Sequence, residues 1–157
     1  MTSKEIRIAY NEYASLDQLD TRDRELAEAA IAATGNSYAP YSRFNVGAAV
    51  RLDNGEIIKG SNQENAAYPS GICAERTAMF YASATYPEAR MKSIAIAASQ
   101  NGVICSNPVS PCGACRQVMA EYQTKGGRDM TILLIGKDKI LKFTRVDDIL
   151  PLIFDSI

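Results

Sequence analysis

Residues 112–136, CGACRQVMAEYQTKGGRDMTILLIG, place an expected helix directly before an apolar strand. The glycines at 126–127 predict the end of the helix, and residues 130–136 have the length and apolarity of a strand buried on both faces. Upstream, CAERTAMFYASATYP (73–87) predicts a helix and MKSIAIAAS (91–99) a strand. This succession predicts one mixed β-sheet covered by helices, an α/β domain built in layers.

The flanking regions extend this pattern at both ends of the chain. Residues 5–13 alternate apolar and polar side chains, which predicts an edge strand, and residues 20–37 predict an amphipathic helix. Residues 45–62 predict a hairpin around Asn54-Gly55, a pair typical of a type I′ turn. Residues 145–154 predict a short helix broken near the proline.

The composition bounds the class of protein. The chain has 157 residues, 46% of them hydrophobic, which suits a single domain over 1–157 with a core of its own. No apolar run is long enough to span a membrane, and the first residues lack the pattern of a secretory signal, so we expect no membrane partner and a cytoplasmic location. The 17 basic residues nearly balance the 18 acidic ones and do not cluster along the chain, so we expect no nucleic-acid partner.

The absence of histidine narrows the possible chemistry. With no histidine in the chain, Ser-His-Asp catalysis, Cys-His catalysis and histidine-ligated zinc are excluded. A metal site must use cysteine, carboxylate or backbone ligands, and a general acid or base must be a carboxylate, lysine, tyrosine or cysteine.

Three cysteines lie at expected helix starts. Cys73 opens one helix, while Cys112 and Cys115 open another and can share the face of its first turn. Helix N-termini favour thiolates, the form that binds metal, so two facing helix starts could bring three thiolates to one Zn²⁺. Three protein ligands leave a fourth position open, which is typical of catalytic zinc. Glu75 lies near enough to move a proton between water and a substrate nitrogen.

Two further residues bear on this metal hypothesis. Three thiolates carry more charge than Zn²⁺ neutralises, and Arg76 is the nearest cation in the sequence. The main alternative is a closed four-cysteine structural site that includes Cys105. Outside the cysteine stretches, we interpret VGAA at 46–49 as close packing of a strand on a helix rather than as a binding loop.

The motifs resemble a known family. YAPYSRFNVGAA, GSNQENAAYPSGICAERTA and SPCGACRQVM occur in the order found in cytidine deaminases of the small, homotetrameric, three-cysteine zinc type. The resemblance covers roughly residues 20–155 and implies a cytidine deaminase-like three-layer fold. Residues 1–17 precede the usual family start and form an N-terminal extension, and Asn45 stands where the family has proline.

The resemblance also implies roles for individual residues. Glu75 is the proton shuttle and Arg76 donates to the ligand thiolates. The implied zinc ligands are Cys73, Cys112 and Cys115, and the implied substrate-binding residues are Phe44, Asn62, Glu64, Ala74 and Phe154. Asn62 and Glu64 would hold ribose hydroxyls, Phe44 would pack near the pyrimidine, and Phe154 would enter the site of a neighbouring subunit.

The expected activity is hydrolytic deamination of free cytidine and 2′-deoxycytidine in pyrimidine salvage, with Zn²⁺ as cofactor and a nucleoside as the small-molecule substrate. The alternatives are a deaminase of nucleic acid, a deaminase of a cytosine-containing antibiotic nucleoside, and a non-enzymatic zinc or redox module. The first predicts a basic track and exposed stacking aromatics. For the third, metal content with and without Cys105 is the discriminating measurement.

Overall fold

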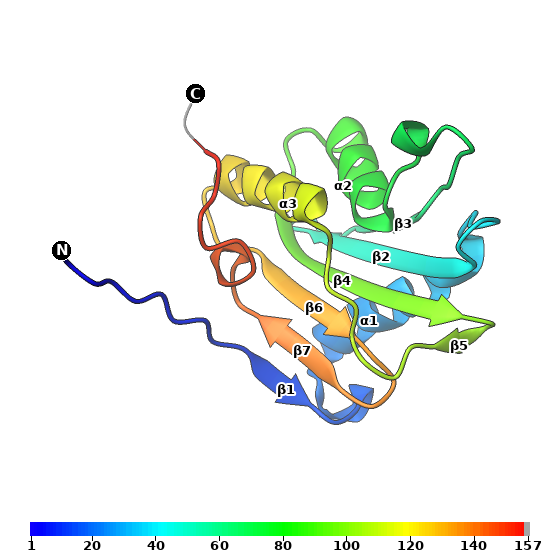
Figure 1. Ribbon diagram of the computed structural model, residues 1–157, viewed down its shortest axis with the longest axis horizontal. Helices are drawn as coiled ribbons and strands as arrows, with labels where there is room; N and C mark the ends of the chain where they lie inside the picture. Colours follow the sequence, from blue (N-terminus) through cyan, green and yellow to red (C-terminus); the bar gives the residue numbers. More distant parts are fainter. Residues whose placement is uncertain (156–157) are drawn as a thin grey trace.

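The computed structural model describes residues 1–155 and contains one mixed sheet with helices on both faces (Figure 1). The strands are β1 (Asn11–Tyr13), β2 (Phe44–Leu52), β3 (Ile57–Ser61), β4 (Met91–Gln100), β5 (Val103–Ile104), β6 (Thr131–Ile135) and β7 (Ile140–Phe143). The α-helices are α1 (Thr21–Ala33), α2 (Ala74–Thr85) and α3 (Gly113–Gly126). The strand order is β1-β7-β6-β4-β2-β3, and β5 pairs with β4.

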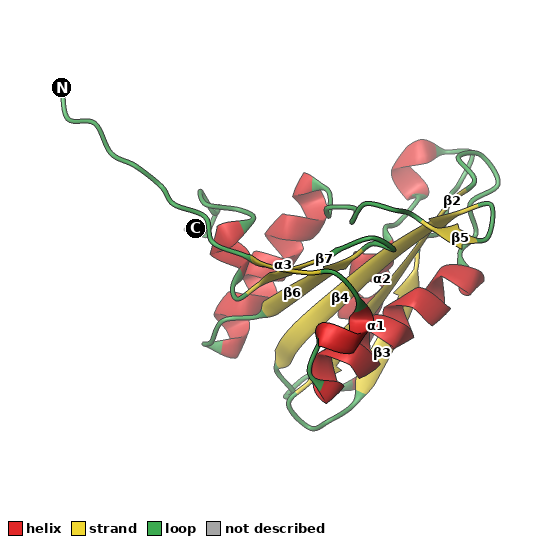
Figure 2. Cartoon of the chain, turned by 90° about the horizontal axis from the view of Figure 1, so that it is seen from below, coloured by secondary structure: helices red, strands yellow, loops and turns green. Residues whose placement is uncertain are grey.

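The helices divide between the two faces of the sheet (Figure 2). On one face, Leu26 and Ala30 of α1 pack with Ala49 and Leu133 of the sheet. On the other face, α2 and α3 pack over a larger cluster of buried residues that includes Met79, Met119, Ile94, Ile96 and Ile132. The three-layer α/β architecture predicted from the sequence is therefore confirmed.

Strand direction explains why α2 and α3 begin close together. β3 and β4 are both antiparallel to β2, so they run in the same direction. The chain leaves β3 into α2, and it leaves β4 through β5 and a loop into α3, before β6 pairs parallel to β4. Both helices therefore begin at the edge where parallel strands end, which is where ligands bind in open α/β sheets.

Two glycines let the helices approach the sheet closely. A Cβ at Gly47 would lie 2.2 Å from the carbonyl oxygen of Ala30 in α1, and a Cβ at Gly60 would lie 2.4 Å from the backbone nitrogen of Ala78 in α2. No side chain fits in either gap. The interpretation of residues 46–49 as strand-on-helix packing is confirmed, and Gly60 does the same for the helix that carries Cys73.

Three sequence predictions need correction, and two strands were missed. The edge strand spans only Asn11–Tyr13, and residues 1–10 lie outside the sheet. The end of the chain forms a single 3₁₀ turn at Val146–Asp148 rather than a helix over 145–154. Strands β5 and β7 were not predicted. The β2–β3 turn is not type I′ either, because Gly55 has a φ of +95° while Asn54 has no positive φ.

No helix within residues 1–155 is both long and apolar enough to cross a bilayer.

Candidate active site

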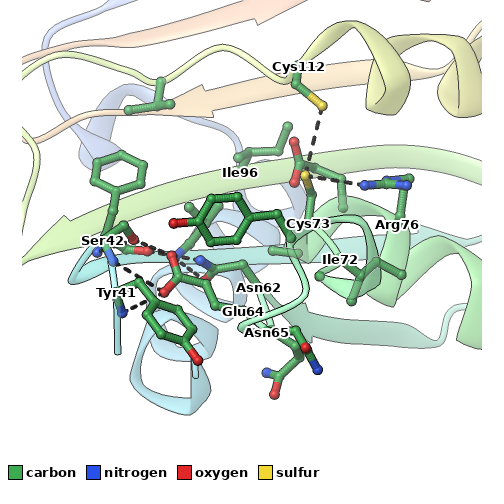
Figure 3. Close-up of a pocket in the computed structure, with 18 of the residues that line it drawn as sticks. Tyr41, Ser42, Asn62, Glu64, Asn65, Ile72, Cys73, Arg76, Ile96 and Cys112 are labelled. Atoms are coloured by element: carbon green, nitrogen blue, oxygen red, sulfur yellow. Dashed lines mark hydrogen bonds between the residues drawn. The ribbon is translucent and has the colours of Figure 1, made fainter. Parts of the chain in front are cut away.

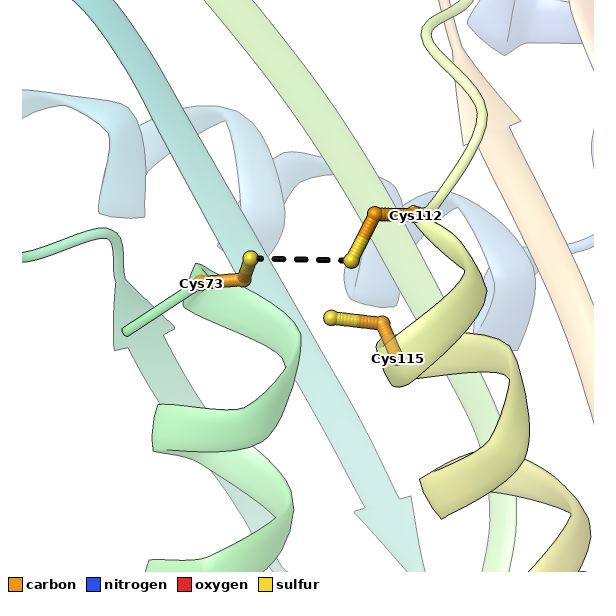
Figure 4. A group of neighbouring side chains, drawn as sticks. All are labelled: Cys73, Cys112 and Cys115. Carbon is orange, nitrogen blue, oxygen red and sulfur yellow. Dashed lines mark hydrogen bonds between the residues drawn. The ribbon is translucent and has the colours of Figure 1, made fainter. Parts of the chain in front are cut away.

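Three cysteine side chains meet between the starts of α2 and α3 (Figure 4). Cys73 is the N-cap residue of α2, Cys112 is the N-cap residue of α3, and Cys115 lies buried in the first turn of α3. Their sulfur atoms all lie within 4.8 Å of one another, and those of Cys73 and Cys112 are 3.8 Å apart. The two facing helix starts predicted from the sequence thus form a three-sulfur cluster.

The cluster has the dimensions that zinc requires. Zn–S bonds of about 2.3 Å in a tetrahedron place neighbouring sulfur atoms about 3.8 Å apart. The Cys73–Cys112 separation of 3.8 Å matches this value. Cys105 is not part of the cluster, and no fourth His, Cys, Asp or Glu joins it among residues 1–155. The geometry fits an open three-ligand site and disfavours the closed four-cysteine alternative.

The thiols influence one another's ionisation. A hydrogen bond from the Cys115 thiol, together with Arg76, lowers the pKa of Cys73 to about 5. The pKa of Cys115 is raised, because its proton is shared with Cys73 and its sulfur is buried. Three thiolates this close need a multivalent cation between them, and Zn²⁺ supplies that charge.

Arg76 faces the sulfur cluster from the first turn of α2. Its Nη2 lies 3.7 Å from the Cys73 sulfur, and its buried Nε has no hydrogen-bond partner within residues 1–155. The Cys73 thiolate raises the pKa of the guanidinium. Arg76 therefore lies within hydrogen-bonding distance of a cluster sulfur, and its role in neutralising the thiolates stays a prediction.

Glu75 is a buried carboxyl group beside the cluster. Its side chain is 4% exposed. Burial raises the pKa of this carboxyl, while a hydrogen bond from its own backbone N–H opposes the change. A carboxyl group with a raised pKa binds a proton more readily than an exposed one, which suits a general acid–base catalyst.

A cavity of about 720 Å³ joins the cluster to the start of β2 and the segment after β3 (Figure 3). Cys73, Ala74, Glu75, Arg76 and Cys112 line one end, which we call the metal end. The other end is lined by Tyr41, Ser42, Phe44, Asn62 and Glu64. We call it the sugar end, because the resemblance predicts that Asn62 and Glu64 bind ribose hydroxyls. The cavity thus brings together eight of the ten predicted site residues.

The side chain of Asn62 forms hydrogen bonds to the backbone at the start of β2. Its Oδ1 accepts hydrogen bonds from the Ser37 hydroxyl and from the backbone N–H of Val46, the latter at 2.8 Å. Its Nδ2 donates to the carbonyl oxygen of Phe44 at 2.9 Å. One N–H of the side-chain amide remains available to a ligand.

Glu64 holds the loop that precedes β2 (Figure 3). Its Oε2 accepts from the backbone N–H groups of Tyr41, at 2.9 Å, and of Ser42, at 3.2 Å. Its Oε1 accepts from the Ser42 hydroxyl, and this bond lowers the pKa of the carboxyl. A carboxylate has about four acceptor sites, so about one remains free for a ligand.

Comparison with known proteins identifies the family. A family model described as "Cytidine and deoxycytidylate deaminase zinc-binding region" matches residues 20–126. The cytidine deaminase of Mycobacterium tuberculosis strain CDC 1551 is 35% identical over 122 residues, which cover 78% of this chain and 81% of the relative. The chain belongs to the cytidine deaminase family.

Other cytidine deaminases agree with this membership. The protein of Halalkalibacterium halodurans is 51% identical over 100 residues, covering 63% of this chain and 71% of the relative. A crystal structure of cytidine deaminase from Burkholderia pseudomallei has a TM-score of 0.68 at 40% identity, covering 83% of this chain and 97% of that one. Family membership and the sulfur cluster together identify Zn²⁺ as the cofactor.

Two predicted site residues do not line the cavity. Cys115 is fully buried, and its sulfur belongs to the cluster with Cys73 and Cys112. Phe154 is 67% exposed, and its carbonyl oxygen accepts a hydrogen bond of 2.7 Å from Gln117 of α3. Within a single chain of this cytidine deaminase, Phe154 therefore takes no part in the site.

The polar cavity residues that sequence reasoning missed include Tyr41, Ser42 and Tyr68. Tyr41 and Ser42 lie in YAPYSRF, which reads as a turn-rich connection and carries no chemical signal of its own. Tyr68 lies in the 3₁₀ turn Tyr68–Ser70 before α2. Only the long-range hydrogen bonds to Glu64 reveal the role of the loop, and no local pattern encodes them.

Proposed function

We propose that the chain hydrolyses free cytidine and 2′-deoxycytidine to uridine and 2′-deoxyuridine with release of ammonia. The C4–N bond of the pyrimidine breaks, water supplies the oxygen that replaces the amine, and the two protons of that water leave on the product and on ammonia. The observation that carries this proposal is the cavity itself, with a buried Glu75 and a cluster of three cysteines at one end and the polar groups of Asn62 and Glu64 at the other.

Glu75 moves the proton in this reaction. When bound by the three cysteines, Zn²⁺ supplies a Lewis acid that lowers the pKa of water at its open position. Glu75 takes a proton from water and donates it to ring N3, then takes the second proton from the same oxygen and delivers it to the departing amine. Burial raises the pKa of Glu75, which makes the carboxyl a stronger base toward water than an exposed glutamate would be.

Residues next to Glu75 orient the reacting ring. Ala74, the first residue of α2, is fully buried and lines the cavity, so its backbone can contact the base. Phe44 lines the cavity from the start of β2, where its ring can pack near the pyrimidine. Arg76 stabilises the ligand thiolates, which keeps the excess negative charge of three sulfurs from weakening the Lewis acid.

The unused hydrogen-bond donor and acceptor at the sugar end match one hydroxyl group. After the internal hydrogen bonds are counted, Asn62 offers one N–H and Glu64 about one acceptor site. A single hydroxyl accepts from the first and donates to the second. Because one ribose hydroxyl satisfies both groups, loss of the other still leaves a substrate, which supports activity on both cytidine and 2′-deoxycytidine.

Incubation of the purified protein with cytidine tests the activity directly. We expect the ultraviolet spectrum to shift to that of uridine, with one ammonia released per nucleoside. Zinc removed by a chelator should abolish the shift, and added zinc should restore it. Zinc-loaded protein that leaves cytidine unchanged would overturn the proposal and favour the non-enzymatic zinc module.

We also propose a homotetramer in which Phe154 of one subunit completes the site of another. Phe154 and Leu152 are 67% and 83% exposed, and single chains rarely leave such apolar tails uncovered. The hydrogen bond from Gln117 fixes the tail on α3, away from its own cavity.

We propose a cytoplasmic location, because the metal ligands are free thiols and the cytoplasm keeps thiols reduced.

Mixed tetramers test the sharing of sites. Glu75→Ala and Phe154→Ala each disable one half of a shared site. If Phe154 acts in the neighbouring subunit, co-assembly creates some sites with both residues intact, and turnover at low cytidine should exceed that of either variant. If mixing restores nothing while the tetramer forms, each Phe154 serves its own chain.

A further inference from the structure

The Ser42 hydroxyl links the two parts of the sugar end (Figure 3). It donates a hydrogen bond to Oε1 of Glu64 and accepts one of 3.0 Å from the backbone N–H of Phe44. The same carboxylate accepts from the Ser42 backbone N–H through its other oxygen. One hydroxyl therefore connects the carboxylate proposed for the sugar with the residue proposed for the base.

The backbone around Ser42 is held in an unfavourable turn. Arg43 has a φ of +55°, a left-handed conformation uncommon for residues other than glycine. This turn brings the N–H of Phe44 back to the hydroxyl two residues before it. Strained backbone persists only where its surroundings hold it, and here the surroundings include Glu64 and the hydrogen bond from Arg43 N–H to the carbonyl oxygen of Ala39.

We propose that Ser42 is a positioning residue that fixes Oε1 of Glu64 for the sugar hydroxyl. This inference rests on the proposed function. Oε1 has no other donor from residues 1–155, whereas Oε2 has two backbone donors. Loss of the Ser42 hydroxyl therefore frees the ligand-binding oxygen while the loop stays attached through the other one.

The competing interpretation makes Ser42 an ordinary turn residue. Serine hydroxyls often accept from a nearby backbone N–H, and such a bond stabilises a turn without reference to any ligand. A turn residue affects every substrate equally when it is replaced. A residue that positions Glu64 affects a substrate only if that substrate carries the hydroxyl that Glu64 binds.

The test combines variants of Ser42 with removal of the sugar hydroxyls. For Ser42→Ala we expect KM for cytidine to rise about 3- to 10-fold, the range of one moderate hydrogen bond, with a smaller change in kcat. For 2′,3′-dideoxycytidine, which lacks both hydroxyls, KM or the inhibition constant should equal that of the wild type. Ser42→Thr keeps the hydroxyl and should restore the cytidine value.

Controls distinguish failure of the Ser42 proposal from failure of the proposed cytidine deaminase activity. Ser83→Ala makes the same chemical change in the second half of α2, outside the cavity, and should leave all constants and the melting temperature unchanged. An equal loss for cytidine and dideoxycytidine in Ser42→Ala, or no loss for either, overturns the positioning role. Failure of the wild type to deaminate cytidine is a different result and overturns the proposed function instead.

Discussion

The two ends of the cavity are built in different ways. At the metal end, Cys73 and Cys112 are the N-cap residues of helices whose inner faces lie in the core. At the sugar end, Asn62 and Glu64 lie outside regular strands, are only partly buried, and connect to the β2 loop through side-chain hydrogen bonds. The packing of whole elements fixes the metal end, and individual side-chain contacts fix the sugar end.

This difference predicts separate consequences for mutation. A change of side-chain chemistry at the metal end should alter turnover while the buried helices keep their places. A change at the sugar end should alter substrate binding and the local structure together, because the same groups serve both purposes. Four substitutions test this division, from the largest expected effect to the smallest.

Glu75→Gln should give the largest effect. The variant keeps the shape of the buried side chain but cannot transfer a proton, so we expect kcat to fall about 10²- to 10⁴-fold or more. Burial already disfavours the ionised carboxyl, so the melting temperature should be unchanged or higher. Stopped assays with cytidine, metal analysis and thermal unfolding measure the three quantities.

A matched change outside the site provides the control for Glu75. Glu88→Gln alters an exposed residue after α2 and should affect neither rate nor metal content. Turnover close to wild type in Glu75→Gln would contradict the proton-transfer role, and loss of zinc would show that the metal end depends on this side chain for its assembly.

Arg76→Ala should have the second largest effect. Its guanidinium contacts the Cys73 sulfur, and hydrogen bonds to charged groups contribute about 1.5–3 kcal/mol, which corresponds to about 10- to 100-fold in kcat/KM. Arg76→Gln keeps a donor and should lose less. Equal and negligible effects of both variants would make Arg76 a structural residue of α2 rather than part of the metal end.

Asn62→Ala should show the combined effect expected at the sugar end. It leaves the N–H of Val46 and the carbonyl oxygen of Phe44 without partners, at a cost of about 1–3 kcal/mol each if they stay buried. We expect a lower melting temperature together with a higher KM for cytidine, and one zinc per chain as in the wild type.

Asn62→Asp refines this test because it keeps the acceptor for Val46 and replaces the donor to Phe44 with a charged oxygen. Its melting temperature should fall less than that of Asn62→Ala, while KM still rises. If Asn62→Ala instead strips zinc from the protein, the two ends are not structurally separate and the comparison fails.

The sequence predicted the metal end better than the sugar end for the same physical reason. The spacing of the cysteines and their places at expected helix starts were enough to predict Cys73, Cys112 and Cys115 as ligands. The helices α2 and α3 begin within one residue of their expected positions. Asn62 and Glu64 were identified only by resemblance. Their partners in the β2 loop lie 16–25 residues away along the chain, so no local pattern records those contacts.

The turns of the sheet show a similar limit. Asn54-Gly55 and Asn101-Gly102 present the same dipeptide, yet only the second has positive φ at both residues, as a type I′ turn requires. The first closes a longer loop in which the N–H of Gly55 donates to the carbonyl oxygen of Leu52. The dipeptide is compatible with both turns, and the pairing of the adjoining strands selects between them.

Cys105→Ala should have the smallest effect, and it tests whether the metal end is complete with three cysteines. Both backbone polar groups of Cys105 form hydrogen bonds: its N–H donates to the carbonyl oxygen of Ala98, and its carbonyl oxygen accepts from the backbone N–H of Lys137. Its half-buried side chain lies outside the sulfur cluster. Substitutions away from special features usually change stability by about 0.5 kcal/mol or less, so we expect one zinc per chain and nearly full activity. Cys115→Ala is the matched control: it makes the same change inside the cluster and should remove the metal. If Cys105→Ala also removes the metal, the closed four-cysteine site is correct and the open catalytic position is lost with it.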